Sequence, residues 1–421
     1  PLFVSILATG FRDDPGRFGL TVDYVKIMFP YLACMSVVGI YGGMLNALHR
    51  FAAAAAAPLL LNVCLITGLL LYADRPVEDI GQAAAIAVMT GGILQLLTLI
   101  YAASRSKLLL RLRLPRLTSS VTRMIKLGTP GFIAAGALQI NLIVGTNVAS
   151  RQLGANSWLA YADQLYQLPL AIIGIALGVV LMPAISRSVK SGDESGAVKT
   201  LSRGIEIALF FALPAAAALI VIPDRLCAAL FQDLAGDVTR MIGAGGSAFN
   251  DTDVSQTGLA LMLFGVGLPA FVLQKVLNAA FFAREDTKTP MKFALIGIAL
   301  NAIISISLFP HIGFLSVPLG TICASWTEVT LLSITLGRKG FLSPGATFVS
   351  RTIRVVMTAI GLGGLLYLLR GEWDALRSLA FGQDWLLLLG VVGLSVAAYA
   401  VVAILIGAIK PREWQGGVSA S

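Results

Sequence analysis

The chain has 421 residues, of which 57% are hydrophobic and 13% are charged, and its mean hydropathy is +0.84. A soluble domain has about 45–50% apolar and about 25% charged residues, so this composition excludes an ordinary water-soluble fold and indicates an integral membrane protein. The formal net charge is +9, but the basic residues stand between apolar runs without interleaved aromatic residues, which argues against a nucleic-acid-binding protein.

Eleven apolar runs follow one another along the chain, each near the length of about 17–25 residues that a helix needs to cross a bilayer. In chain order they cover residues 27–48, 52–72, 80–102, 127–150, 157–185, 207–223, 257–281, 293–310, 312–336, 355–369 and 385–409. The sequence therefore predicts an all-α polytopic membrane protein with about eleven transmembrane helices.

Lysine and arginine are distributed unequally between the loops on the two sides of these helices. Alternate loops, from residues 46–51 to the C-terminal residues 410–421, contain 21 of the 31 basic residues, the opposite loops contain 9, and the last one is Lys275 inside a helix. Because positively charged loops stay in the cytoplasm, the C-terminus is predicted to be cytoplasmic. Pro1 is then outside, and since the residues from Leu2 onward read like the end of a helix, we expect an odd number of further helices upstream.

Two segments six helices apart share a pattern that indicates an internal repeat. Asn46 is followed by Pro58, and Asn278 is followed by Pro290, at the same spacing in both. Each segment joins two consecutive helices on the predicted cytoplasmic side, as in transporters built from parallel repeats. On the opposite side, the helical spacing of Leu226 and Leu230 predicts a short helix along the membrane surface.

Three ionisable residues lie well inside predicted helices, namely Asp163, Lys275 and Glu328. An intramembrane charge costs about 2.5–3.5 kcal/mol on insertion scales, so each needs water, a partner or a changed protonation state. Asp163 and Lys275 are candidates for the lining of a water-filled substrate cavity, and Asn278 is expected on the same helix face as Lys275. The alternatives are an interfacial position for Asp163, a structural ion pair for Lys275 and snorkelling for Glu328.

The predicted helix 127–150 is unusually polar for one that faces lipid. Gln139 and Asn147 are candidates for lining the substrate cavity. The alternative is that the amides of this helix, Asn141 among them, form hydrogen bonds to neighbouring helices.

The loop after residues 257–281 is short and densely charged. Pro290 suits the first turn of the next helix, but this does not explain the charges of Arg284, Asp286 and Lys288. Together with Arg50 in the matching loop of the repeat, we interpret them as a cytoplasmic gate, or as residues that contact an anionic head group.

Sequence motifs for catalysis and cofactor binding are missing from the chain. It contains no nucleotide-binding loop and no nucleophile elbow, and its four cysteines and two histidines lack metal-ligand spacing. We therefore expect a non-enzymatic protein with no catalytic residue, metal or cofactor. Its energy source would be an ion gradient, the membrane potential or the substrate gradient.

Several motifs together resemble the MurJ/MviN lipid II flippase family over essentially the whole chain. They are Met28-Phe-Pro-Tyr31, Leu45-Asn46 with Arg50-Phe51, Ala57-Pro58, Trp158 with Tyr161-Ala-Asp163, Gln167-Leu-Pro169, Gly174 to Gly178, Leu181-Met-Pro183 and the loop Phe281 to Pro290. The resemblance adds Gln164 and Gln167 to Asp163 as candidate substrate-binding residues. Many members have arginine where this chain has Gln164, so Lys275 or upstream helices would supply the cation for a pyrophosphate.

The resemblance also implies the architecture. The family has fourteen helices, of which this chain would contain about eleven, and belongs to the multidrug/oligosaccharidyl-lipid/polysaccharide exporter superfamily. Two pseudo-repeated lobes are followed by two C-terminal helices with a lipid-facing groove. The expected parts are the remainder of an N-terminal lobe at 1–126, a C-terminal six-helix lobe at 127–336, and two additional helices with a cytoplasmic tail at 337–421.

The function implied is a lipid II flippase of the inner membrane. It would move the undecaprenyl-pyrophosphate-linked precursor by alternating access for peptidoglycan synthesis, cell wall biogenesis and cell shape. Its partners would be lipid II and membrane lipids, with a coupling ion as a further candidate. One alternative is a drug or polysaccharide-lipid exporter of the same superfamily, and another, from a different class, is a membrane-embedded glycosyl or lipid transferase.

Overall fold

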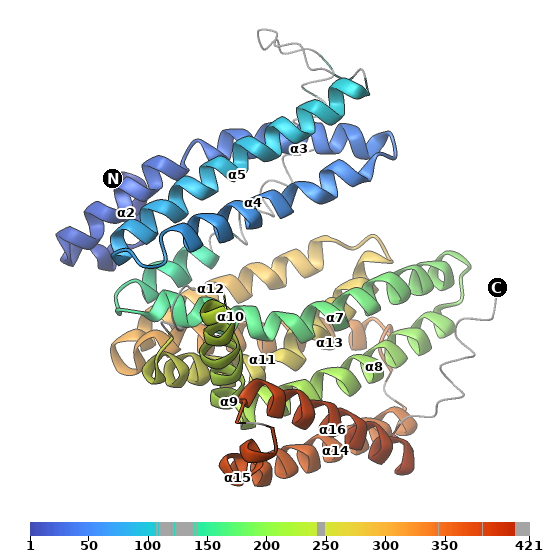
Figure 1. Cartoon of the computed structure of the whole chain (residues 1–421). Coiled ribbons are helices and arrows are strands. Elements are labelled where there is room, and N and C mark those ends of the chain that lie inside the picture. The colour runs from blue at the N-terminus through green and yellow to red at the C-terminus, as the bar shows by residue number, and fades with distance from the viewer. Residues whose placement is uncertain are drawn as a thin grey trace. The chain divides into compact units, whose positions relative to one another are not determined.

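The computed structural model describes residues 1–106, 141–241, 249–343, 345–380 and 382–408, with single residues at 108, 119, 122, 136 and 139. The described residues are helical apart from turns (Figure 1). The chain divides into two compact units. The first comprises Pro1–Phe132 and Val238–Gly246, and the second comprises Ile133–Asp237 and Ser247–Ser421. The three parts expected from the sequence, 1–126, 127–336 and 337–421, stay a prediction.

The first unit is built on three long apolar helices. Its elements are α1 (Leu2–Leu7), η1 (Thr9–Asp13), α2 (Pro15–Met28), α3 (Tyr31–Ala47), α4 (Phe51–Leu71) and α5 (Val77–Arg105). Asp14 caps α2 by accepting hydrogen bonds from the first-turn N–H groups of Gly16 and Arg17. The core lies between α3, α4 and α5, where Leu45, Ala57 and Leu99 are almost fully buried.

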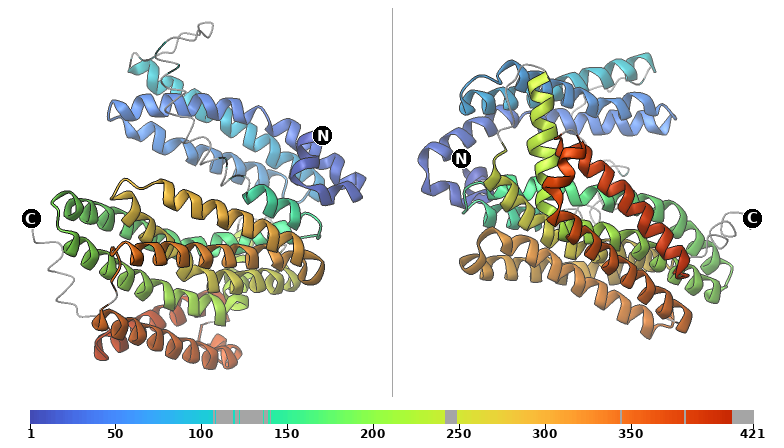
Figure 2. Two further views of the ribbon diagram at one scale, coloured as in Figure 1. Left: turned by 180° about the vertical axis from the view of Figure 1, so that it is seen from behind. Right: turned by 60° about the horizontal axis from the view of Figure 1, so that its bottom comes forward.

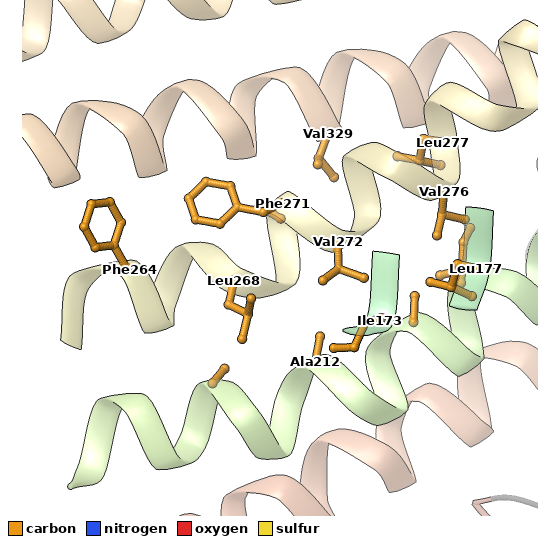
Figure 3. Packing of buried hydrophobic residues seen from close by; sticks show 14 of the residues in the cluster. Ile173, Leu177, Ala212, Phe264, Leu268, Phe271, Val272, Val276, Leu277 and Val329 are labelled. Atoms are coloured by element: carbon orange, nitrogen blue, oxygen red, sulfur yellow. The ribbon is translucent and has the colours of Figure 1, made fainter. Parts of the chain in front are cut away.

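The second unit is built around α11, whose middle is buried on nearly all sides. Its elements are α7 (Ala155–Lys190), α8 (Glu194–Val221), α9 (Pro223–Cys227), η2 (Ala228–Leu234), α11 (Asp251–Phe282), α12 (Lys288–Ile312), η3 (Gly313–Leu315), α13 (Ser316–Arg338), α14 (Ala346–Gly371), α15 (Trp373–Arg377), η4 (Ser378–Ala380) and α16 (Asp384–Leu405). Helix α10 (Ala235–Met241) is shared between the two units. Figure 3 shows Leu268 and Val272 of α11 packed beside Ile173 of α7 and Ala212 of α8, which makes α11 the centre of the core.

The helices confirm the predicted class. Ten of the eleven predicted helices coincide with α3, α4, α5, α7, α8, α11, α12, α13, α14 and α16, while the run 127–150 lies largely outside the described residues. Within the described part, eight stretches are long and apolar enough to cross a membrane. One of them, Lys288–Arg338, contains both α12 and α13. The chain is thus an all-helical, multi-pass membrane protein.

The segment after α8 is helical, as the spacing of its leucines predicted, and its place along the membrane surface stays a prediction. Leu226 and Leu230 pack against both hydrophobic clusters of the second unit. They lie between the α7–α8–α11 core and the final helices, where they cover apolar surface of both. Helix α14 packs against α8, and α16 packs against α14 and η2, so the final helices complete this packing (Figure 2).

The end of the second unit is fixed by polar contacts outside the predicted membrane spans. The buried carboxylate of Asp384 accepts a hydrogen bond from the Trp373 indole at 3.1 Å and forms an ion pair with Arg377, whose Nε lies 3.2 Å away. Burial, then the hydrogen bond and negative charge of Asp384, raise the pKa of the neighbouring Asp233 to about 6. These contacts attach α15 and α16 to η2.

The two turns of the sequence repeat share one backbone conformation. His49 between α3 and α4 and Glu285 between α11 and α12 have φ values of 58° and 60°, the only positive φ values of non-glycine residues in the described chain. In each turn the following N–H donates to a carbonyl five residues earlier, from Arg50 to Leu45 and from Asp286 to Phe281. His49 follows Asn46 by three residues, whereas Glu285 follows Asn278 by seven. The structural match is therefore displaced by one helical turn from the sequence match.

Candidate functional site

A polar face runs along α7. Asp163, Gln167 and Gly174 lie on one side of this helix because their spacings of four and eleven residues are close to whole turns. Gln167 donates a short hydrogen bond to the Asp163 carboxylate, which is half-buried. The side chains of Gln164 and Gln167 are both exposed.

Lys275 reaches this face of α7 from the neighbouring helix α11. Its side chain is exposed, and a Cβ atom placed on Gly174 would lie 2.7 Å from Lys275 Nζ. The missing side chain of Gly174 therefore makes the space in which the ammonium group lies. Gly174 is eleven residues from Asp163, about 16 Å along the helix, so Lys275 and Asp163 share a face without forming an ion pair.

Glu328 of α13 belongs to a different set of contacts. Gln274 Nε2 donates to Glu328 Oε2 at 3.0 Å, and the Asn278 side chain also lies close to this carboxylate. Asn278 was expected on the same face of α11 as Lys275, and this expectation is wrong. Gln274 and Asn278 are one helical turn apart, so both side chains point toward α13. In the described chain, Glu328 is held by amides and Lys275 has no carboxylate partner.

The polar residues of the predicted helix 127–150 separate into two groups. Asn141 accepts a hydrogen bond from Asn301 Nδ2 of α12 at 2.5 Å, and Ser305 donates to Asn301 Oδ1 at 3.0 Å. Asn141 thus joins two helices, as the alternative interpretation proposed. Gln139 is exposed, and Asn147 is half-buried with contacts inside the chain.

Arg284, one of the four predicted gate residues, forms polar contacts within the second unit. Its Nη2 lies 2.6 Å from Glu194 at the start of α8, and its Nη1 donates to the Ala280 carbonyl. The guanidinium also stacks over the Phe341 ring at 4.0 Å, and the side chain is only 10% exposed. Arg284 therefore ties α11 to α8 and to the segment after α13.

Asp286 makes a second tie of the same kind. Lys339 Nζ lies 3.0 Å from its carboxylate, and Thr289 donates to it through both backbone and hydroxyl. Partial burial raises the pKa of Asp286, but these hydrogen bonds outweigh it, so the pKa lies below that of an ordinary aspartate. Lys288 is exposed, and Arg50 of the first unit donates to Ser106 at 2.7 Å.

An apolar cavity of about 440 Å³ opens between α7, α8, α14 and α16. Its wall includes Leu168, Phe211, Leu366 and Val396. Tyr399 also lines it and donates its hydroxyl to the Phe210 carbonyl at 2.9 Å, which joins α16 to α8. An apolar pocket of this size is suited to hydrocarbon.

The sequence and the fold are both similar to proteins of known type. A family model described as lipid II flippase MurJ matches residues 1–381. The chain is 38% identical over 416 residues to the probable lipid II flippase MurJ of Rhizobium tropici, covering 97% of this chain and 75% of that relative. It is 29% identical over 382 residues to the lipid II flippase MurJ of Burkholderia cenocepacia, covering 89% of this chain and 71% of the relative.

Among solved structures, the fold is similar to that of a lipid II flippase MurJ in an inward closed conformation. The TM-score is 0.74 at 20% sequence identity, over 96% of this chain and 78% of that one.

Proposed function

Because the chain belongs to the MurJ family of lipid II flippases, we propose that it moves the undecaprenyl-pyrophosphate-linked peptidoglycan precursor across the inner membrane by alternating access. The observation that carries the site assignment is Lys275, an exposed ammonium within a membrane helix that lies over Gly174 on the polar face of α7. Such a cation is costly in lipid and suited to a diphosphate in a wet cavity.

The site combines chemistry for both parts of this substrate. Lys275 would bind the pyrophosphate. The amides of Gln164 and Gln167 would donate hydrogen bonds to the sugar and peptide and accept them, and the Asp163 carboxylate would accept them. The apolar cavity beside Tyr399 would hold part of the prenyl chain.

A drug exporter would need no fixed phosphate-binding cation. Transport of lipid II by the protein reconstituted in vesicles tests the proposal, and vesicles that carry another prenyl-linked sugar measure its selectivity.

Asp163 is expected to contribute to transport rather than to folding. Asp163→Ala should reduce lipid II transport about tenfold or more, because a half-buried intramembrane carboxylate that faced only lipid would add cost without benefit. The amount of protein in the membrane should stay near the wild-type level. Growth of a flippase-depleted strain and quantitative immunoblotting measure the two effects. Normal growth with Asp163→Ala would remove this residue from the site.

The proposed orientation places the C-terminus and the turn after α7 in the cytoplasm, and α10 outside. In a cysteine-free background, Arg240→Cys should react with an impermeant thiol reagent in intact cells, whereas Lys190→Cys should not. Both should react after the cells are permeabilised, which controls for access. Labelling of position 190 but not of position 240 in intact cells would reverse the topology.

A coupling ion is also part of the proposal, because the chain has no nucleotide-binding loop to supply energy. Asp163 is the acid on the polar face of α7 where a cation would meet the substrate. Lipid II transport into vesicles should therefore slow when an imposed cation gradient is dissipated.

A further inference from the structure

The second unit contains a polar cavity that the transport proposal does not use. It has a volume of about 420 Å³ and lies between the first part of α8 and the start of α14. This volume is within the range of about 300–1,000 Å³ that is usual for ligand sites. The charged side chains in its wall are Lys199, Arg203, Glu206 and Arg351, and the hydroxyl side chains are Thr200, Ser202, Ser343 and Thr347.

The wall of this cavity has a net positive charge. Lys199 and Arg203 are one turn apart on α8 and so present their charges on one face. Arg351 of α14 forms an ion pair with Glu206 at 3.5 Å, and both side chains are at most a quarter exposed. The Glu206 carboxylate holds the Arg351 guanidinium in the wall. Lys199, Arg203 and Arg351 together carry more positive charge than this one carboxylate neutralises.

The N-terminus of α14 adds a second feature that favours an anion. The N-cap residue is Gly345, so no side chain at that position satisfies the first-turn N–H groups. Gly345, Thr347 and Phe348 all line the cavity, which places this first turn in its wall. The positive end of a 26-residue helix therefore meets the same space as the three basic side chains.

The position along the chain indicates where the ligand comes from. The cavity is formed by the segments 186–203 and 337–354 and by the adjoining turn of α8, next to apolar runs that begin at 207 and 355. Both segments are on the predicted cytoplasmic side, so the cavity lies at the level of the lipid head groups of that leaflet. Anionic lipids attract basic segments there, and Val198 and Phe348 offer apolar contacts to a glycerol backbone.

We propose that this cavity binds the phosphate diester of an anionic phospholipid head group from the cytoplasmic leaflet. The bound lipid bridges α8 and α14, and so joins the C-terminal helices to the core of the second unit. The site is separate from the Lys275 face and requires no lipid II.

The test uses the full chain in neutral detergent and measures bound phosphatidylglycerol by native mass spectrometry. Lys199→Gln should weaken phosphatidylglycerol binding about tenfold, because one charge-assisted contact is lost. Lys199→Glu should weaken it further. Lys190→Gln and Lys190→Glu are the matched controls, since Lys190 is an exposed cation at the end of α7 outside the cavity, and they should leave binding unchanged. Phosphatidylcholine should bind without dependence on Lys199.

Three results would overturn the proposal. Equal losses for the Lys199 and Lys190 variants would show general surface attraction instead of a site. Unchanged phosphatidylglycerol binding by Lys199→Glu would exclude the cavity. Binding of inorganic phosphate that depends on Lys199, with no such dependence for phosphatidylglycerol, would assign the site to free phosphate and exclude the lipid. Because lipid II transport is not measured, failure here leaves the proposed transport function untouched.

Discussion

Lys275→Glu is expected to abolish binding of the lipid-linked pyrophosphate substrate. Hydrogen bonds to charged groups contribute about 1.5–3 kcal/mol, so loss of the ammonium alone should weaken binding about tenfold to a hundredfold. The new carboxylate would also repel the diphosphate. Lys275→Arg should keep part of the affinity, although its planar guanidinium fits less well against Gly174. Lipid II binding to purified protein measures both variants.

Gly174 provides a matched test of the same geometry. Gly174→Ala places a methyl group 2.7 Å from Lys275 Nζ, so the ammonium must move and substrate binding should weaken. Gly178→Ala is the control, because a Cβ atom there meets nothing within 4 Å on the same helix. Both substitutions should stabilise α7 slightly and to a similar extent, because alanine favours a helix over glycine. A difference in substrate binding between the two variants would therefore come from the displaced Lys275 side chain.

The competing hypothesis makes Lys275 a structural partner of Asp163, which lies too far along α7 for an ion pair, or of Glu328. The contacts of Glu328 with Gln274 and Asn278 argue against it. If Glu328→Lys restored function to Lys275→Glu, the two residues would be a structural pair and the pyrophosphate role would be excluded. Wild-type affinity in both Lys275 variants would exclude it as well.

The sequence was sufficient to predict the helices and the intramembrane charges, for one physical reason. A lipid environment requires long apolar helices, and it makes each buried charge costly, so both features are visible without knowledge of the fold. Asp163 and Lys275 were found in this way. Whether both residues lie along one face of α7 depends on how α11 packs against that helix. The only local feature of the sequence that indicates this packing is Gly174, which leaves space for the Lys275 side chain.

The partners of the predicted gate residues could not be read from the sequence. The charges of Arg284 and Asp286 were evident, but their partners Glu194 and Lys339 are 90 and 53 residues away in the sequence. No local pattern connects residues so distant, because the pairing is made by the packing of α8 and α13 around α11. Both contacts lie within the second unit, and the role of Arg284 and Asp286 in a cytoplasmic gate stays a prediction.

Gly320→Ala is expected to destabilise the second unit strongly. Its new Cβ atom would lie 2.4 Å from Asn301 Oδ1, 2.6 Å from Ser305 Oγ and 2.9 Å from the Asn301 backbone oxygen. The Asn301 side chain is held by Asn141 and Ser305, and the backbone oxygen belongs to α12, so neither can simply rotate away. Helices α12 and α13 must separate, which should cost about 1–3 kcal/mol, as overpacking does in other cores.

Thermal unfolding in detergent measures this cost, and a second glycine of the same helix controls for it. A Cβ atom on Gly337 would approach only the Leu342 carbonyl, at 4.0 Å. Gly337→Ala should therefore keep the unfolding midpoint or raise it, because alanine favours a helix by up to about 1 kcal/mol over glycine. Gly320→Ala gains the same helix preference, so its lower midpoint would come from the clash alone. Equal midpoints for the two variants would show that α12 and α13 are not packed closely at Asn301, and that the polar contacts of Asn141, Asn301 and Ser305 do not fix the distance between these helices.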